Sequence, residues 1–242
     1  MMTFTRPDGR SHDEHRHVDI ALGVAPAAQG SALIRCGNTH VICAASIMPG
    51  VPEWMTGRGV GWLTAEYSML PYATSPRNRR EQERLSGRTQ EIRRLIGRSL
   101  RASLDMTLLG ERTVCIDADV LQADGGTRTA AVTGGWVALA IALQRLVVAG
   151  ELVPRAMPTP VAAISVGICQ GQPILDLCYS EDSQAEVDLN LVMDGQGRYI
   201  EVQGTAEGRP FSRAQLDVML SLGEQGVRSL MVLQRAALEG AR

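Results

Sequence analysis

The chain has 242 residues, of which 45% are hydrophobic and 21% charged, and its net charge at pH 7 is −2. This balance is typical of a soluble globular protein with one large domain or two closely packed halves, and it excludes a disordered chain and a protein that is basic overall. The N-terminus is polar without an apolar signal core, and no apolar run reaches the length of a membrane span, so we expect a cytoplasmic protein with no membrane partner.

All 24 basic residues are arginine. The absence of lysine excludes a P-loop lysine, a lysine Schiff base and a lysine nucleophile. Any anion site must therefore use guanidinium groups, backbone N–H groups, helix ends or a metal. The five cysteines are odd in number and lack CxxC spacing, which favours buried thiols over disulfides or zinc.

The first part of the chain combines strand patterns with two helical segments. Alternating and β-branched residues predict strands at 18–24, 31–37, 40–48, 61–70 and 113–122. Apolar side chains recur at helical spacing in 81–104, which predicts a helix. The apolar run 129–150 is too long for a strand and predicts a buried helix that Gly150 ends.

The remainder returns to strands before a helical C-terminus. Strands are predicted at 161–170, 173–179, 186–194 and 199–207. A capping box of Ser212 and Gln215 then introduces one or two amphipathic helices. This order predicts an α/β (α+β) fold in which two similar halves pack around one core.

The stretch QADGGTRTA (122–130) places a glycine turn between a predicted strand and a predicted helix. Free N–H groups and the helix dipole make such a turn suitable for an anion, and Thr127 and Arg128 add further donors. The spacing matches neither GxGxxG nor GxxxxGK[ST]. A site for a single phosphate and a plain left-handed turn both remain open from this stretch alone.

Nine arginines and three glutamates lie between residues 77 and 101. A solvated helix face with local ion pairs is one explanation, but the glutamates are too few to neutralise the arginines. Uncompensated like charge favours an anionic partner such as an RNA or DNA backbone. Aromatic residues form only 4% of the chain, which favours phosphate and shape contacts over base stacking.

Carboxylates gather between residues 176 and 188. Asp182 is expected on a turn, and Glu186, Asp188 and Asn190 would share a face if 186–191 is a strand. Such oxygen ligands suit Mg²⁺ or Mn²⁺. An acidic hairpin in water is the alternative for this segment by itself.

Four long stretches resemble the ribonuclease PH family of bacteria. They are GWLTAEYSMLP (61–71), SGRTQEIRRLIGRSLRA (86–102), IDADVLQADGGTRTAAVTG (116–134) and EVQGTAEGRPFSRAQL (201–216). The resemblance covers nearly the whole chain, although Cys178, His17 and Tyr72 depart from the family pattern. It implies a single ribonuclease PH domain over 1–242 with a fold of the ribosomal protein S5 domain 2-like type. Within this domain, two pseudo-repeated βαβ-type halves of mixed sheet would span about 1–155 and 156–242.

The resemblance also implies an activity, a phosphorolytic 3′→5′ exoribonuclease that trims tRNA precursors. Inorganic phosphate would attack the terminal phosphodiester and release nucleoside diphosphates, with Mg²⁺ as cofactor, in a hexameric ring of three dimers. Carried over by motif, the phosphate-binding residues are Arg88, Gly126, Thr127 and Arg128. The catalytic and metal-binding pair is Asp182 and Asp188. Arginines associated with RNA binding or ring assembly are Arg77, Arg80, Arg94 and Arg98.

Two other functions are compatible with parts of this pattern. One is a catalytically silent RNA-binding ring subunit, although such subunits often lose the phosphate arginines or the acidic pair, and both are present here. The other is a metal-dependent hydrolytic nuclease, which would release monophosphates and work without added phosphate.

Overall fold

The structure, a computed structural model, describes residues 5–81 and 85–240. Its first half forms a five-stranded sheet in the order β1-β2-β3-β5-β4, which is antiparallel except for the parallel β4–β5 pair. The strands are β1 (Val18–Leu22), β2 (Gly30–Cys36), β3 (Thr39–Pro49), β4 (Trp62–Met69) and β5 (Arg112–Gln122). Helix α1 (Gly87–Arg101) is the crossover that the parallel pair requires.

The second half forms an antiparallel four-stranded sheet in the order β7-β6-β8-β9. Its strands are β6 (Val161–Cys169), β7 (Gln172–Leu175), β8 (Val187–Asp194) and β9 (Tyr199–Ala206). The remaining helices are α2 (Thr127–Val148), α3 (Tyr179–Asp182) and α4 (Arg213–Glu239). Short 3₁₀ turns lie at Glu53–Met55, Pro71–Ala73, Met106–Leu109 and Pro154–Ala156. The α/β class is confirmed, with the parallel pair in the first half.

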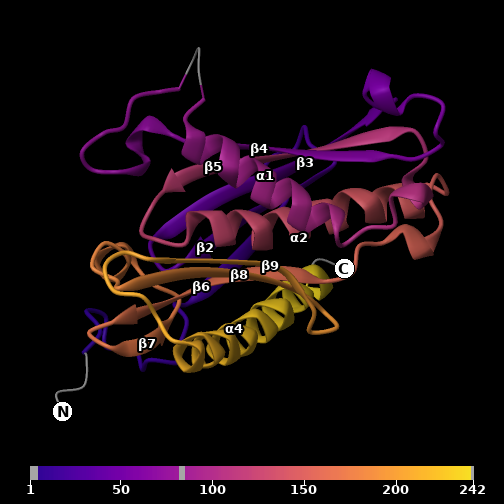
Figure 1. Cartoon of the computed structure of the whole chain (residues 1–242). Helices are drawn as coiled ribbons and strands as arrows, with labels where there is room; N and C mark the ends of the chain where they lie inside the picture. Colours follow the sequence, from indigo (N-terminus) through magenta and orange to yellow (C-terminus); the bar gives the residue numbers. More distant parts are fainter. Residues whose placement is uncertain (1–4, 82–84, 241–242) are drawn as a thin grey trace.

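Helices α1 and α2 lie between the two sheets, and α4 covers the opposite face of the second sheet (Figure 1). Helix α2 packs closely on β2, because a Cβ atom at Gly30 would lie 2.1 Å from the Ala138 carbonyl oxygen. It also contacts the first part of β6, which the short strand β7 does not reach, and there the Thr133 hydroxyl accepts from Ala163 N at 3.1 Å. One helix therefore joins both halves.

Helix α2 is long and apolar enough to cross a membrane by length and composition, contrary to the expectation that no run reaches that length. In this fold it is the central core helix, with 67% of its most apolar stretch buried inside the molecule. Residues such as Leu139 and Leu143 have no exposed surface. The hydrophobic composition of α2 is thus explained by packing between two sheets.

Two element predictions need correction, and a third is confirmed. Strand β7 ends at Leu175, so the predicted strand 173–179 is too long. Asp176 takes a left-handed φ of +52° and breaks the strand. The helix predicted at 81–104 begins only at Gly87, after Ser86 caps it by accepting from Thr89 N at 3.1 Å. The C-terminal segment is one helix, α4, and its capping box is confirmed.

Candidate active site

The two halves of the chain meet in a cleft of about 690 Å³. Helices α1 and α2 border it from the first half, and α3 and β8 border it from the second. Six of the residues singled out in the sequence line this cleft: Arg88, Gly126, Thr127, Arg128, Asp182 and Asp188. Residues that are up to 100 positions apart therefore converge on one space.

The glycine turn before α2 forms one wall of the cleft. Gly125 and Gly126 have φ values of +72° and +64°, a left-handed conformation that glycine adopts without steric cost. A Cβ atom at Gly125 would lie only 2.5 Å from the Leu177 carbonyl oxygen. Among the described residues, no side chain caps the first turn of α2. Its free N–H groups and positive dipole end are therefore available to an anion in the cleft.

The hydroxyl of Thr127 is held by a buried partner. Its Oγ1 lies 2.9 Å from Tyr67 Oη, and both residues are buried. Burial raises the pKa of Tyr67, which keeps the phenol neutral. This hydrogen bond fixes the Thr127 side chain at the start of α2.

Arg128 joins three elements at the wall of the cleft. Its Nη1 donates to Glu91 Oε1 and to Gln203 Oε1, both at 3.0 Å, and Gln203 Nε2 donates to the same Glu91 oxygen at 2.6 Å. The hydrogen bond from Gln203 and the charge of Arg128 lower the pKa of Glu91 against the effect of burial. Helix α2, helix α1 and β9 are thereby locked around one guanidinium.

Arg88 completes the basic wall from the first turn of α1. Within residues 5–81 and 85–240, no group forms a hydrogen bond or an ion pair with its guanidinium. An exposed guanidinium that lines a cleft beside free helix N–H groups is suited to bind an oxyanion.

The acidic wall consists of Asp182 on α3 and Asp188 on β8. Burial raises the pKa of Asp182, and burial together with the charge of Asp182 raises the pKa of Asp188. From the part of the chain that the structure describes, the Asp188 carboxylate receives only long hydrogen bonds, 3.3 and 3.4 Å, from Asn190 Nδ2. The two carboxylates therefore retain free oxygen lone pairs that face the cleft.

This pair fits a magnesium ion. Mg²⁺ is usually bound through one or two carboxylates, with waters and substrate phosphates completing its shell. Within the described part of the chain, no cluster of three or more histidine, cysteine, aspartate or glutamate side chains could hold a metal alone. A cation at Asp182 and Asp188 would therefore share its coordination with substrate.

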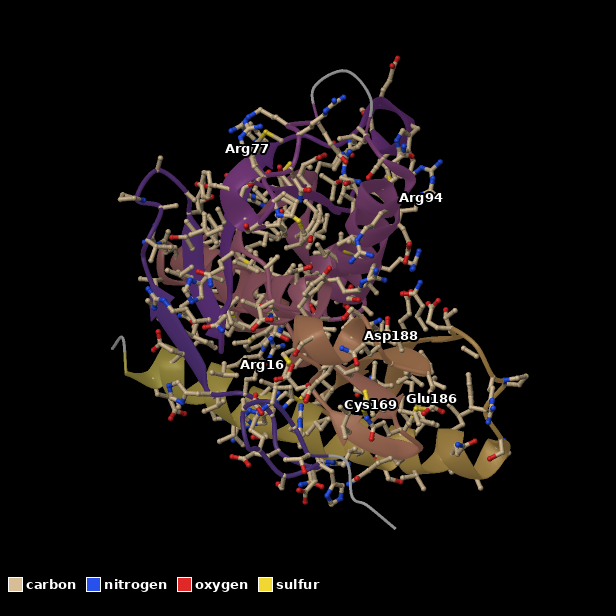
Figure 2. The ribbon with its side chains drawn as sticks, turned by 90° about the vertical axis from the view of Figure 1, so that its left-hand side faces the viewer. Arg16, Arg77, Arg94, Cys169, Glu186 and Asp188 are labelled. Atoms are coloured by element: carbon tan, nitrogen blue, oxygen red, sulfur yellow. The ribbon has the colours of Figure 1, made fainter. Side chains whose placement is uncertain are left out.

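Glu186 does not join these carboxylates. Strand β8 begins at Val187, and Glu186 Oε1 instead accepts from Gly171 N at 2.8 Å, in the turn between β6 and β7. Figure 2 labels Glu186 beside Cys169 and Asp188 nearer the first half. The expectation of a face shared by Glu186, Asp188 and Asn190 is therefore wrong for Glu186.

The arginines expected to contact RNA lie around the cleft, outside its lining. Arg77 and Arg80 are exposed in the loop whose neighbouring residues, 74–76 and Asn78, line the cleft. On α1, Arg98 pairs with Glu201 at 2.7 Å and Arg94 borders a separate depression. Figure 2 places Arg77 and Arg94 on the first half, at some distance from Asp188. Arg84 lies outside the described residues.

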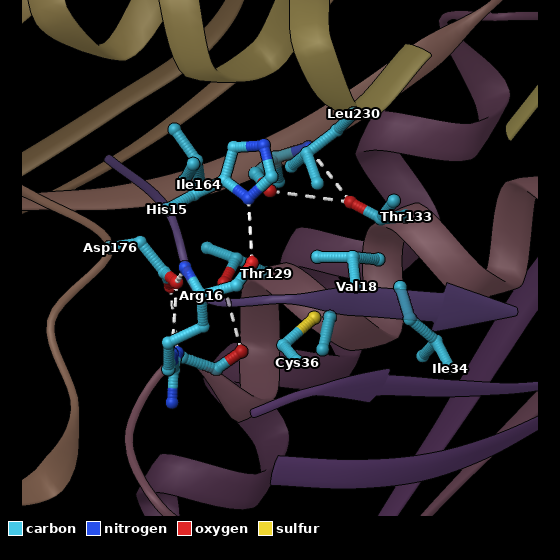
Figure 3. Close-up of a pocket in the computed structure, with 13 residues that line it drawn as sticks. His15, Arg16, Val18, Ile34, Cys36, Thr129, Thr133, Ile164, Asp176 and Leu230 are labelled. Atoms are coloured by element: carbon cyan, nitrogen blue, oxygen red, sulfur yellow. Dashed lines mark hydrogen bonds and ion pairs between the residues drawn. The ribbon is translucent and has the colours of Figure 1, made fainter. Parts of the chain in front are cut away.

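Two buried ion pairs behind the cleft were missed by reasoning from sequence. Arg6 binds Glu181 through two hydrogen bonds of 2.8 and 2.9 Å, beside the catalytic candidate on α3. Arg16 binds Asp176 in the same manner below the glycine turn (Figure 3). The partners are 160 and 175 residues apart, so they leave no local spacing signal in the sequence.

Comparison with known proteins identifies the family. The model of the 3′ exoribonuclease family, domain 1, matches residues 14–143, and that of domain 2 matches residues 159–226. Proteins named Ribonuclease PH from Cyanothece sp. and Corynebacterium efficiens are 54% identical over 237 and 238 residues, covering 98% of this chain and 99% and 97% of theirs.

Solved structures share the fold. The Archaeoglobus fulgidus exosome with RNA bound to the active site has a TM-score of 0.80 at 24% identity and covers 93% of this chain and 91% of its own. Rice Rrp46 has a TM-score of 0.79 at 18% identity, with 96% and 100% covered.

The full-length match to ribonuclease PH proteins favours a phosphorolytic enzyme over both a silent ring subunit and a hydrolytic nuclease. The cleft agrees with this, because its basic and acidic walls are both intact. The chain therefore belongs to the ribonuclease PH family, and it is a phosphorolytic 3′→5′ exoribonuclease, a nucleotidyltransferase that uses inorganic phosphate as co-substrate.

Proposed function

We propose that this enzyme trims the 3′ ends of tRNA precursors and other structured RNAs in the cytoplasm, and that it requires Mg²⁺. The observation that carries the proposal is the single cleft in which free helix N–H groups and two arginines face two carboxylates. Phosphorolysis needs this pairing, because an anionic nucleophile must approach an anionic diester.

In this proposal Arg88, Arg128, the Thr127 side chain and the N–H groups after Gly126 hold the attacking phosphate. Guanidinium forks and backbone donors fix its orientation and offset its charge. A phosphate oxygen then attacks the terminal phosphorus of the RNA. The bond to the 3′ oxygen of the preceding nucleotide breaks, that oxygen takes up a proton, and the terminal nucleotide leaves as a diphosphate. Alignment of the two reactants supplies most of the catalysis, and no covalent enzyme intermediate is needed.

Asp182 and Asp188, on the acidic wall of the cleft, would hold the Mg²⁺ ion. When bound, the ion offsets negative charge that develops on the reacting phosphates. The acidic pair itself positions the ion from two elements, α3 and β8, that are fixed by separate contacts. These roles are supported by the position and free lone pairs of both carboxylates.

Arg77, Arg80, Arg94 and Arg98 are proposed to bind the RNA backbone or to contact neighbouring subunits. Their exposure on the first half, next to the mouth of the cleft or along α1, is compatible with either role. The chain is further proposed to act as one domain over residues 1–242, with halves of about 1–155 and 156–242, because α2 packs on both sheets. A homohexamer, formed as a trimer of dimers, completes the proposal.

One experiment tests the reaction. The protein is incubated with Mg²⁺ and a tRNA that carries a 3′ extension, with and without inorganic phosphate, and the released nucleotides are identified. We expect shortening only with phosphate, with nucleoside diphosphates as products. Equal shortening without phosphate, or monophosphate products, would overturn it. Light scattering of the same preparation tests the hexamer.

A further inference from the structure

A buried ion pair lies directly beneath the glycine turn. Arg16 Nε donates to Asp176 Oδ2 at 2.9 Å and Arg16 Nη2 donates to Oδ1 at 2.7 Å, while the Arg16 backbone N–H also donates to Oδ2 at 2.8 Å (Figure 3). The two side chains are only 5% and 8% exposed. The space beside them measures about 10 Å³, scarcely enough for one water molecule.

The other edge of the Arg16 guanidinium holds the turn itself. Nη1 donates to the Asp124 carbonyl oxygen, and Nη2 donates to the Gly125 carbonyl oxygen at 3.5 Å. A Cβ atom at Gly126 would lie 2.9 Å from Arg16 Nη2, so the turn rests on the guanidinium. Arg16 thus binds the Asp124 carbonyl group closely, while Thr39 Oγ1 donates to the Gly125 carbonyl oxygen at 2.6 Å. Together these contacts fix the turn in the orientation that directs the first N–H groups of α2 to the cleft.

The ionised state of the pair is secured by its geometry. Burial would raise the pKa of Asp176, but hydrogen bonds and the charge of Arg16 outweigh this effect and lower the pKa. Asp176 also adopts a left-handed φ of +52°, which is uncommon for residues other than glycine. Buried ion pairs are on average no more stabilising than apolar residues of similar volume, so the pair calls for an explanation other than stability.

We propose that Arg16 and Asp176 are positioning residues for phosphate. Together they contact the Asp124–Gly126 turn on the side away from the cleft and hold it in its anion-binding conformation. This inference rests on the proposed binding of inorganic phosphate at that turn. The guanidinium is essential to the arrangement, because its planar fork bonds the carboxylate on one edge and two carbonyl groups on the other. A lysine ammonium cannot satisfy both edges at once.

The chain offers a matched control in the Arg6–Glu181 pair. That pair is also buried, at 2% and 0% exposure, and is also joined by two hydrogen bonds. Arg6 contacts the Asp176 carbonyl oxygen and the carbonyl groups of Ser11 and Glu14, but within the described residues it makes no hydrogen bond to the glycine turn. A role limited to folding would make Arg6→Lys and Arg16→Lys behave alike.

The test compares Arg16→Lys and Asp176→Asn with Arg6→Lys and with Leu143→Val, a mild core change at the far end of α2. Phosphate KM is measured at saturating RNA, RNA KM at saturating phosphate, and the Kd of inorganic phosphate on RNA-free protein. We expect phosphate KM and Kd to rise about 10- to 100-fold in the two pair variants, with RNA KM unchanged. Neither control should change phosphate KM.

Arg128→Ala separates this inference from the proposed function. If Arg128→Ala leaves phosphate KM unchanged, the assignment of the phosphate site fails. The positioning role is overturned if Arg128→Ala raises the phosphate KM while Arg16→Lys and Asp176→Asn do not. It is also overturned if these two variants lower only the melting temperature, or if they change the phosphate KM and the RNA KM equally. Should Arg16→Lys not fold, Asp176→Asn decides the test, because asparagine also tolerates the left-handed conformation.

Discussion

Replacing Arg128 with alanine tests the assignment of the phosphate site most directly. Among residues 5–81 and 85–240, Glu91 and Gln203 are the partners of its guanidinium, and both bind Nη1, each at 3.0 Å. The remaining N–H groups are free to hold phosphate from the wall of the cleft. Loss of one well-placed donor to a reacting oxyanion typically lowers the rate by about 10²–10³. We expect a comparable loss of kcat/KM for phosphate.

The same change should have little effect on folding. Glu91 is 46% exposed, so its ion pair with Arg128 is screened by solvent and contributes at most about 1 kcal/mol. Gln203 keeps its 2.6 Å hydrogen bond to Glu91 after the arginine is removed. Activity should therefore decrease by orders of magnitude while the melting temperature changes by a few degrees at most.

The assay follows phosphorolysis of a 3′-extended tRNA over a range of phosphate concentrations. Arg98→Ala is the matched control, since Arg98, like Arg128, forms an ion pair with a glutamate and contacts β9, through Glu201, but lies outside the cleft lining. We expect Arg128→Ala to raise the phosphate requirement and to leave RNA affinity nearly intact, whereas Arg98→Ala should leave the phosphate requirement unchanged. An equal loss of RNA affinity in Arg128→Ala would refute the phosphate role.

Asp182→Asn should abolish Mg²⁺-dependent turnover. The fold should stay intact, because no described residue donates a hydrogen bond to that carboxylate. Turnover is measured as diphosphate release, and retained turnover would show that Asp182 is dispensable. Gly125→Ala should lower the free energy of unfolding, measured by denaturant titration, by at least about 1–2 kcal/mol. The residue has a left-handed φ, and the new Cβ atom would lie 2.5 Å from the Leu177 carbonyl oxygen. An unchanged free energy of unfolding would contradict this prediction. Arg16 lowers the pKa of Asp176 in the folded protein below its unfolded-state value of about 3.9. The ionised Asp176 therefore contributes its full stabilisation above the unfolded-state pKa, and this contribution is lost as the pH falls through the folded-state pKa. Acid should therefore destabilise the parent protein more steeply below about pH 4 than Asp176→Asn, and parallel curves of unfolding free energy against pH would argue against it.

Features with a local physical cause were predictable from sequence. The apolar run at 129–150 corresponds to α2, because a long hydrophobic segment must be buried and is too long for a strand. The paired glycines at 125 and 126 indicated a left-handed turn, and both have positive φ values. Ser212 and Gln215 form the predicted capping box through contacts within one helical turn.

Features that depend on distant partners were not predictable. The segment after Leu175 has the composition of a strand, yet it turns because the Asp176 carboxylate is bound by an arginine 160 residues away. Glu186 follows the alternation of a strand but is drawn to Gly171 N by a neighbouring turn. Periodicity describes one element at a time, whereas these side chains are placed by contacts with other elements of the fold.

The use of arginine at two positions near the contact between the two halves has a structural explanation. Arg16 uses one edge of its guanidinium for Asp176 and the other for the turn carbonyl groups. Arg128 uses one nitrogen for Glu91 and Gln203 and keeps the others for the cleft. In both cases a planar cation with several directed donors links two elements and still presents donors to a third group, which the single ammonium of lysine cannot do. The cleft therefore depends on arginine for its construction as well as for the anion binding proposed above.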